Sequence, residues 1–213
     1  MNLMFHLREL NQARLAPWAA IAALIVSGCA LPPGMDSSRA ISPSVFIELP
    51  PPGYGTLHQD EVSILLTSGK LQILVTPLHE SVTRVTAPDT YERLSSIAKM
   101  HQREAPEGEP QLFLVSFFTD EPAVPFVPEE VQFVSRGLRL RSSTITPVTP
   151  RWGEHRLRQR ETEMAVYSFR GLVDLESNLT LVYGLEQTDA WSMILSRVQT
   201  ERARARARAR RKP

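Results

Sequence analysis

Cysteine is the scarcest residue in this chain of 213 residues, which contains Cys29 and no other. A single thiol excludes a disulfide framework within the chain, a cluster of thiolate metal ligands and a redox pair of cysteines. If Cys29 itself is modified, the rest of the chain contains no thiol at all.

Recognisable catalytic motifs are also missing. The histidines after Cys29 stand singly, without the spacing of a metal site on a helix: His58, His79, His101 and His155. The sequence has no Gly-x-Ser-x-Gly elbow and no phosphate-binding glycine loop. Neighbouring carboxylates such as Asp120 and Glu121 are poor acid/base pairs, because adjacent strand residues point to opposite faces. A turn-bound cation is conceivable at Asp120, Glu121, Glu129 and Glu130.

The sequence therefore favours a non-enzymatic protein with no cofactor and no metal. An exported hydrolase with an unrecognised active site is the alternative. A deep pocket with converging polar groups would favour that alternative.

An export signal is the clearest positive feature. Arg8 and Arg14 precede an apolar run that extends from Ala19 to Ile25, and Val26-Ser27-Gly28-Cys29 closes that run. The run is well short of the roughly 20 residues that a bilayer-spanning helix needs. The segment resembles the signal peptide and lipobox of bacterial lipoproteins, so residues 1–28 are interpreted as a signal peptide.

This resemblance implies that Cys29 receives a diacylglycerol, that a signal peptidase cuts just before it, and that the new amino terminus is acylated. Two or three acyl chains anchor a protein stably, whereas one binds reversibly. The alternatives are an uncleaved anchor or a secretory peptide with an incidental cysteine, and both would still export the domain. In that family, the residue after the cysteine influences which membrane receives the protein. Here that residue is Ala30 and not Asp, which implies a position in the outer membrane facing the periplasm if the source has two membranes.

Charge differs sharply between the body and the C-terminus. The whole chain carries +1, but the region from Cys29 to Glu201 holds 15 basic and 22 acidic residues. Seven basic residues follow: Arg202, Arg204, Arg206, Arg208, Arg210, Arg211 and Lys212. Ala and Arg are good helix formers, so this repeat can extend a preceding helix before it frays.

Residues 202–213 are predicted to be a disordered basic tail that projects from the body. One interpretation is contact with anionic lipid, lipopolysaccharide or a cell-wall polymer. A solvated appendage, or a tail that folds back on its own acidic body, is the alternative. Nucleic acid is disfavoured as a partner, since an exported protein rarely meets it.

The remaining chain divides into a tether and a β-rich domain. Residues 29–57 are rich in Pro, Gly and Ser and are predicted to be a tether. Residues 58–201 contain two hairpins with short glycine turns, at 61–76 and 131–141. Further strands are predicted at 111–118, 163–169 and 179–183. About seven strands favour a mainly β fold, an antiparallel β-sandwich of immunoglobulin-like type.

Two helices accompany these strands. Asp89 and Glu92 form a capping-box pattern, followed by apolar residues at helical spacing, which predicts one inserted helix of about 13 residues. A second helix is predicted after Asp189, with four side chains on one face: Trp191, Ile194, Leu195 and Val198.

Trp152 is the remaining candidate for partner binding. It lies next to Gly153 and among several arginines: Arg151, Arg156, Arg158 and Arg160. This combination suits a cation–π contact with a polymer or an envelope protein. The alternative is a Trp folded over the end of the sandwich, with its charged neighbours in solvent. Taken with the export signal, the sequence predicts a lipid-anchored cell-envelope protein whose β-domain binds or scaffolds a partner.

Overall fold

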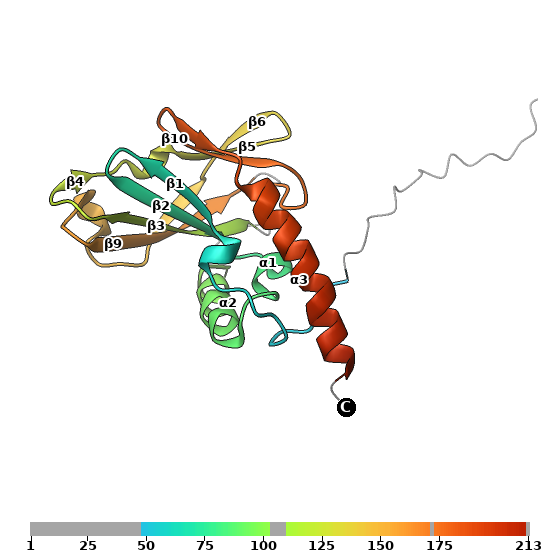
Figure 1. Ribbon diagram of the computed structural model, residues 1–213. Coiled ribbons are helices and arrows are strands. Elements are labelled where there is room, and N and C mark those ends of the chain that lie inside the picture. Colours follow the sequence, from blue (N-terminus) through green and yellow to red (C-terminus); the bar gives the residue numbers. More distant parts are fainter. Residues whose placement is uncertain (1–47, 103–109, 171–172, 212–213) are drawn as a thin grey trace, which may run out of the picture. The chain divides into compact units, whose positions relative to one another are not determined.

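The computed structural model describes residues 48–102, 110–170 and 173–211 (Figure 1). The described residues belong to one compact unit, Ile47–Pro213. The predicted signal peptide and Cys29 lie outside the described residues. The predicted class is confirmed in its main features, because the unit is mainly β, with antiparallel sheets and a C-terminal helix.

The larger sheet has five antiparallel strands in the order β1-β2-β3-β9-β7. Their bounds are β1 Ile64–Ser68, β2 Leu71–Pro77, β3 Gln111–Thr119, β9 Glu161–Phe169 and β7 Thr144–Pro147. The first predicted hairpin is confirmed as β1 and β2, joined by Gly69 and Lys70. Gly69 has a φ of +57°, which glycine adopts without a Cβ penalty.

The smaller sheet has four antiparallel strands in the order β11-β10-β5-β6. Their bounds are β11 Glu186–Thr188, β10 Leu179–Tyr183, β5 Val131–Ser135 and β6 Leu138–Arg141. The second predicted hairpin is β5 and β6, whose turn residues Arg136 and Gly137 both have positive φ. Such a turn matches the twist of the flanking strands. A short ribbon pairs β4 (Val124–Pro125) with β8 (Arg156–Leu157).

The two main sheets share one apolar core. Phe113 of β3 lies against Phe133 of β5, with ring centroids 4.6 Å apart, and Phe117 approaches Tyr183 of β10 at 5.9 Å. Because strand side chains alternate, Leu112 and the other even-numbered residues of β3 point to the opposite face. The odd-numbered apolar residues of β3 therefore face the shared core, and its even-numbered leucines belong to a second apolar cluster.

Helix α2 (Pro88–Gln102) covers that opposite face, burying Leu94 and Ala98 against β3 and β9. The inserted helix is thus confirmed, but its predicted capping box is wrong. The helix begins at Pro88, which suits the first turn because no N–H is needed there, and this places Asp89 inside the turn. Helix α1 (Glu80–Thr83) and three short 3-10 helices were not predicted: η1 Asp60–Val62, η2 Pro128–Glu130 and η3 Trp152–Glu154.

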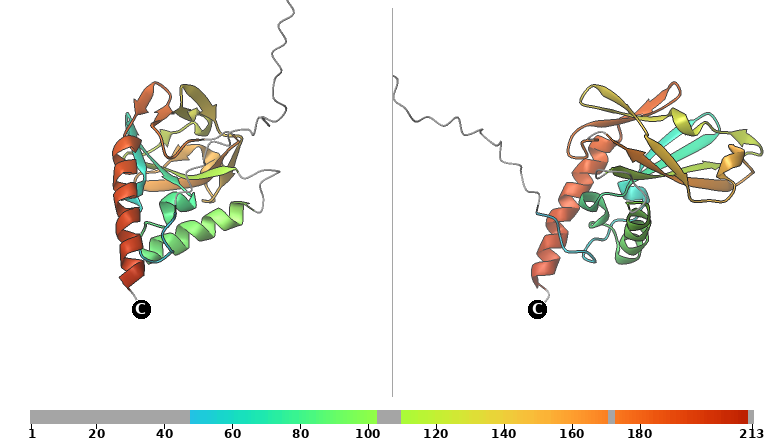
Figure 2. Two further views of the ribbon diagram at one scale, coloured as in Figure 1. Left: turned by 90° about the vertical axis from the view of Figure 1, so that its right-hand side faces the viewer. Right: turned by 180° about the vertical axis from the view of Figure 1, so that it is seen from behind.

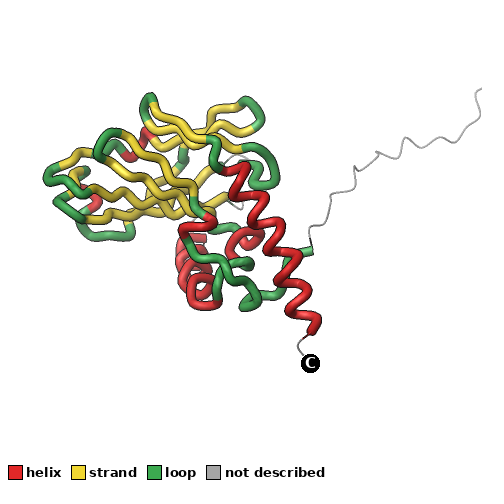
Figure 3. Tube along the Cα trace, viewed as in Figure 1, coloured by secondary structure: helices red, strands yellow, loops and turns green. Residues whose placement is uncertain are grey.

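Helix α3 (Trp191–Arg211) runs along one side of the unit, past the strands and then past α1 (Figures 1 and 2). The tube view shows α1, α2 and the second half of α3 gathered on one side of the strands (Figure 3). The four residues that were predicted to share one face of this helix are all buried in the core: Trp191, Ile194, Leu195 and Val198.

The folded unit is larger than the sequence predicted at its N-terminal side. Residues 48–57 were assigned to the tether, yet Pro50, Gly55 and Leu57 are buried. The Leu57 N–H donates to Val85 O at 3.2 Å, and a Cβ on Gly55 would lie only 2.1 Å from the Val85 carbonyl carbon. Residues 48–57 therefore pack against the domain, because backbone hydrogen bonds and a close glycine contact hold them there.

Candidate functional site

The second half of α3 is the most highly charged element of the domain, and it is not a projecting tail. The helix continues through Arg211, which corrects the prediction of a disordered tail for residues 202–211. Lys212 lies outside the described residues. The buried face continues without interruption, because Glu201, Arg202 and Ala205 follow Val198 at helical spacing and are 3%, 4% and 0% exposed.

Arg202 holds this half of the helix to the body. Its Nη1 and Nη2 donate to the two carboxylate oxygens of Glu176, at 2.9 and 2.7 Å. Its Nε donates to the backbone oxygen of Ser81 in α1, at 2.9 Å. A planar guanidinium satisfies three acceptors in this geometry, so the charge of Arg202 is used inside the protein.

A second set of contacts joins α3 to residues 48–56. Buried Glu201 accepts a hydrogen bond from Thr56 Oγ1 at 2.9 Å and forms an ion pair with Arg208. Arg208 Nε also donates to the Tyr54 carbonyl at 2.9 Å. These contacts explain why a highly charged repeat packs against the domain, since each buried charge has a partner.

The remaining arginines of the repeat are all more exposed than Arg202. Arg206 and Arg210 approach the Glu48 carboxylate at 3.7 and 4.0 Å, and such exposed pairs contribute little to stability. Arg204 and Arg211 are exposed and have no ion pair within the described part of the chain. The six arginines of the repeat therefore separate into two that hold the helix to the domain, Arg202 and Arg208, and four that are partly or fully exposed.

Trp152 is a core residue, and this corrects its predicted role in partner contact. It is 4% exposed, and its ring lies 5.6 Å from Phe117 and 5.1 Å from Phe126. The alternative given by the sequence, a Trp folded over the end of the sheets, describes its position. Burial of the large indole in an aromatic cluster outweighs any contact it could make in solvent.

The arginines near Trp152 differ in their surroundings. Arg151 makes ion pairs with Glu154 and Glu161, and its hydrogen bonds lower the pKa of the Glu154 carboxyl below the usual value. Arg156 donates to the Ala123 carbonyl, and the side chains of Arg156 and Arg158 are exposed. Arg156 and Arg158 are therefore accessible to solvent, whereas Arg151 is paired with neighbouring carboxylates.

A buried carboxylate was missed by the sequence analysis. Glu163 lies in β9 opposite Phe117, is 2% exposed and accepts a hydrogen bond from Thr149 Oγ1. Thr149 Oγ1 in turn accepts from the Met164 N–H at 2.9 Å. The alternation of β9 could have indicated that Glu163 is buried, because Glu163 shares the inward face of the strand with Ala165 and Tyr167. Glu163 therefore helps to hold the segment before Trp152 against β9, through its hydrogen bond with Thr149.

The other candidate groups do not converge. His79 caps α1, where its Nδ1 accepts from the Ser81 N–H at 3.2 Å. In residues 48–102, 110–170 and 173–211, no three His, Cys, Asp or Glu side chains are placed to hold a metal ion. The conceivable cation site at the four carboxylates is therefore not formed. Among the described helices, none has the length and hydropathy needed to cross a membrane.

Comparisons with known proteins add no family to this description. No protein-family model, no curated protein and no solved structure matches the chain.

Proposed function

We propose that this protein is an exported, lipid-anchored component of the cell envelope, whose β-domain binds or scaffolds a partner without catalysing a reaction. The observation that carries the proposal is Val26-Ser27-Gly28-Cys29 at the end of an apolar run preceded by arginines. The proposal includes an immunoglobulin-like sandwich for the domain, supported by two antiparallel sheets that share one core.

The dimensions of the chain agree with a short lipid tether. Eighteen residues separate Cys29 from Glu48, where the folded unit is first described. At most about 3.4 Å per residue, these residues span no more than roughly 65 Å. A domain attached in this way stays close to the membrane surface, which suits recruitment of an envelope partner.

Metabolic labelling of the full-length chain tests the anchor. Wild-type protein produced in a bacterium should incorporate labelled fatty acid and sediment with membranes, whereas Cys29→Ser should lose the label and leave the membrane fraction. A matched control combines Cys29→Ser with Ser44→Cys, which keeps one thiol but moves it out of the lipobox. Labelling of either variant to the wild-type level contradicts the proposal.

A further inference from the structure

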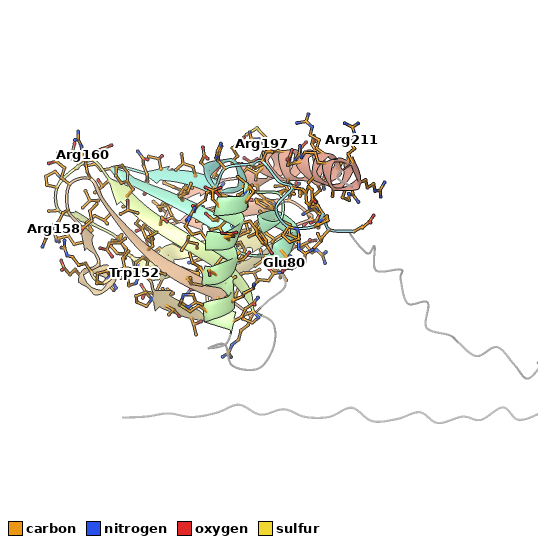
Figure 4. All side chains as sticks on the ribbon, turned by 90° about the horizontal axis from the view of Figure 1, so that it is seen from below. Glu80, Trp152, Arg158, Arg160, Arg197 and Arg211 are labelled. Atoms are coloured by element: carbon orange, nitrogen blue, oxygen red, sulfur yellow. The ribbon has the colours of Figure 1, made fainter. Side chains whose placement is uncertain are left out.

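The solvent face of α3 carries a straight row of arginines. Arg197, Arg204 and Arg211 are spaced seven residues apart, which is about 10.5 Å along a helix and within about 20° of two full turns. All three are exposed, and they form a line of roughly 21 Å. In the view from below, Arg197 and Arg211 both lie along the upper edge of the molecule (Figure 4).

Within α3, the exposed face has no acidic side chain. The only carboxylate of the helix, Glu201, is buried and paired with Arg208. Acidic residues of other segments also contact α3: Glu176, which pairs with the buried Arg202, Glu48, which lies beside Arg206 and Arg210, and Glu61, whose carbonyl oxygen accepts from Arg197 at 3.1 Å. The row therefore presents positive charge, and Arg204 and Arg211 contribute most of it.

One exposed apolar side chain accompanies this charge. Met193 is 70% exposed on the same face, at the start of the row. It lines a shallow, open depression of about 330 Å³ between Leu57 and α3, together with Arg197, Arg204 and the buried Glu201. Guanidinium groups beside an exposed apolar side chain match the chemistry of a phospholipid headgroup, where phosphate lies next to the start of the acyl chains.

The tether joins the domain at α3, on the flank opposite the row. Glu48 lies beside Arg206, which is about 200° around the helix from Arg204. If Cys29 is lipidated, as the proposed function requires, the tether is long enough for either flank of the helix to reach the bilayer. The positive charge of the row is therefore what points to an anionic lipid surface as its occupant.

We infer that the solvent face of α3 is a docking surface for a bilayer that contains anionic phospholipid. Arg197, Arg204 and Arg211 contact the lipid phosphates, and Met193 enters the headgroup layer at the end of the row. The helix lies parallel to the membrane plane, while Arg202 and Arg208 fix it to the domain. This inference rests on the proposed function only for the tether.

Cosedimentation with vesicles tests the inference on residues 47–213. This fragment contains every residue of both apolar clusters and therefore carries its own core. It should bind vesicles of phosphatidylcholine mixed with phosphatidylglycerol, and bind poorly to phosphatidylcholine alone. Each arginine at an anionic surface contributes about fivefold to partitioning, so Arg197→Gln, Arg204→Gln and Arg211→Gln together should weaken binding roughly 100-fold.

The matched control removes three exposed arginines elsewhere, by Arg156→Gln, Arg158→Gln and Arg160→Gln. Figure 4 shows Arg158 and Arg160 at the opposite end of the molecule from Arg211. At physiological ionic strength, salt screens exposed charges beyond roughly 8 Å, and these positions are farther than that from the arginine row. The control should therefore bind vesicles within about twofold of wild type. Thermal melting followed by circular dichroism checks that each variant is folded. If the triple variant of the row does not fold, the single change Arg204→Gln takes its place, with an expected loss of about fivefold in binding.

Three results overturn the inference. These are equal binding to the two kinds of vesicle, equal losses in the row and control variants, and binding to purified lipopolysaccharide or wall polymer without binding to phosphatidylglycerol. The fragment lacks Cys29, so its result is independent of the labelling experiment. Vesicle binding without fatty-acid labelling of the full chain would keep the docking surface and remove the lipid anchor.

Discussion

Arg202 and Glu176 form a two-pronged ion pair, in which both terminal nitrogens of the guanidinium donate to the carboxylate at 2.9 and 2.7 Å. The pair links the middle of α3 to the segment that precedes β10. The Arg202 side chain is 5% exposed and the Glu176 side chain 31% exposed, so the guanidinium is buried while its partner reaches the surface. The pair is one of the contacts that make the Arg-Ala repeat part of the folded unit.

Removing Arg202 should therefore destabilise the domain. Arg202→Ala leaves the partly exposed Glu176 and the Ser81 carbonyl without their donor, and we expect a loss of about 2 kcal/mol in the free energy of unfolding in urea. The control Arg204→Ala changes an exposed neighbour on the same helix and should stay within about 0.5 kcal/mol of wild type. Equal effects of the two changes would contradict the buried ion pair.

Proline substitution distinguishes a docked helix from a tail. Ala205 is 0% exposed in the interior of α3, so Ala205→Pro removes a helical hydrogen bond and introduces a clash. We expect a loss of about 3 kcal/mol or more, accompanied by faster amide exchange in the following turn. Ala209→Pro, one turn nearer the end of the helix, should cost less. A solvated tail would show no change in stability for either variant.

Trp152 should behave as a core residue in both stability and spectroscopy. Trp152→Ala should cost about 3–5 kcal/mol, because it leaves a large cavity beside Phe117 and Phe126. Arg158→Ala, an exposed change nearby, should be nearly neutral. In the fragment of residues 47–213, fluorescence from Trp152 and Trp191 should be insensitive to iodide. Strong quenching in the folded protein would contradict the burial of these two residues.

Acid should weaken the contact between Arg136 and Asp174. Partial burial raises the pKa of the Asp174 carboxyl, but hydrogen bonds from the Glu176 N–H and from Arg136 outweigh it, so the pKa lies below its usual value. A carboxyl with a lowered folded pKa stabilises the fold above its unfolded pKa of about 3.9, and this contribution disappears as pH falls through the folded value.

The measurement for this prediction is thermal unfolding of wild type and Asp174→Asn from neutral pH to below pH 3. Wild type should be the more stable of the two at neutral pH. The difference should shrink below about pH 4, as the carboxyl becomes protonated. A stability difference that grows on acidification would contradict the lowered pKa of the Asp174 carboxyl.

Much of the β-domain could be predicted because its signals are local. Two-residue turns that contain Gly69 and Gly137 defined both hairpins, and alternation along β3 gave the two faces that the core and α2 cover. The first half of α3 followed from apolar residues at helical spacing. The short strands β7 and β11 were missed, because none of their residues is buried and only pairing with a neighbouring strand defines them.

The second half of α3 was missed because its buried residues are polar. The helical period continues from Val198 through Arg202 to Ala205, but a search for apolar side chains stops at Val198. The partners that make burial of Arg202 favourable, Glu176 and Ser81, are distant in sequence. Residues 48–57 were missed for a similar reason, since backbone bonds and the fit of Gly55 hold them in place.

The mass of the mature N-terminal peptide tests the central claim, lipid anchoring at Cys29, most directly. Protein is extracted from bacterial membranes in detergent and digested, and the first peptide is measured by mass spectrometry. The account predicts a peptide that begins at Cys29 and carries the mass of a diacylglycerol thioether together with an amide-linked acyl chain. An unmodified Cys29, or a peptide that continues from Gly28 into Cys29, would contradict it.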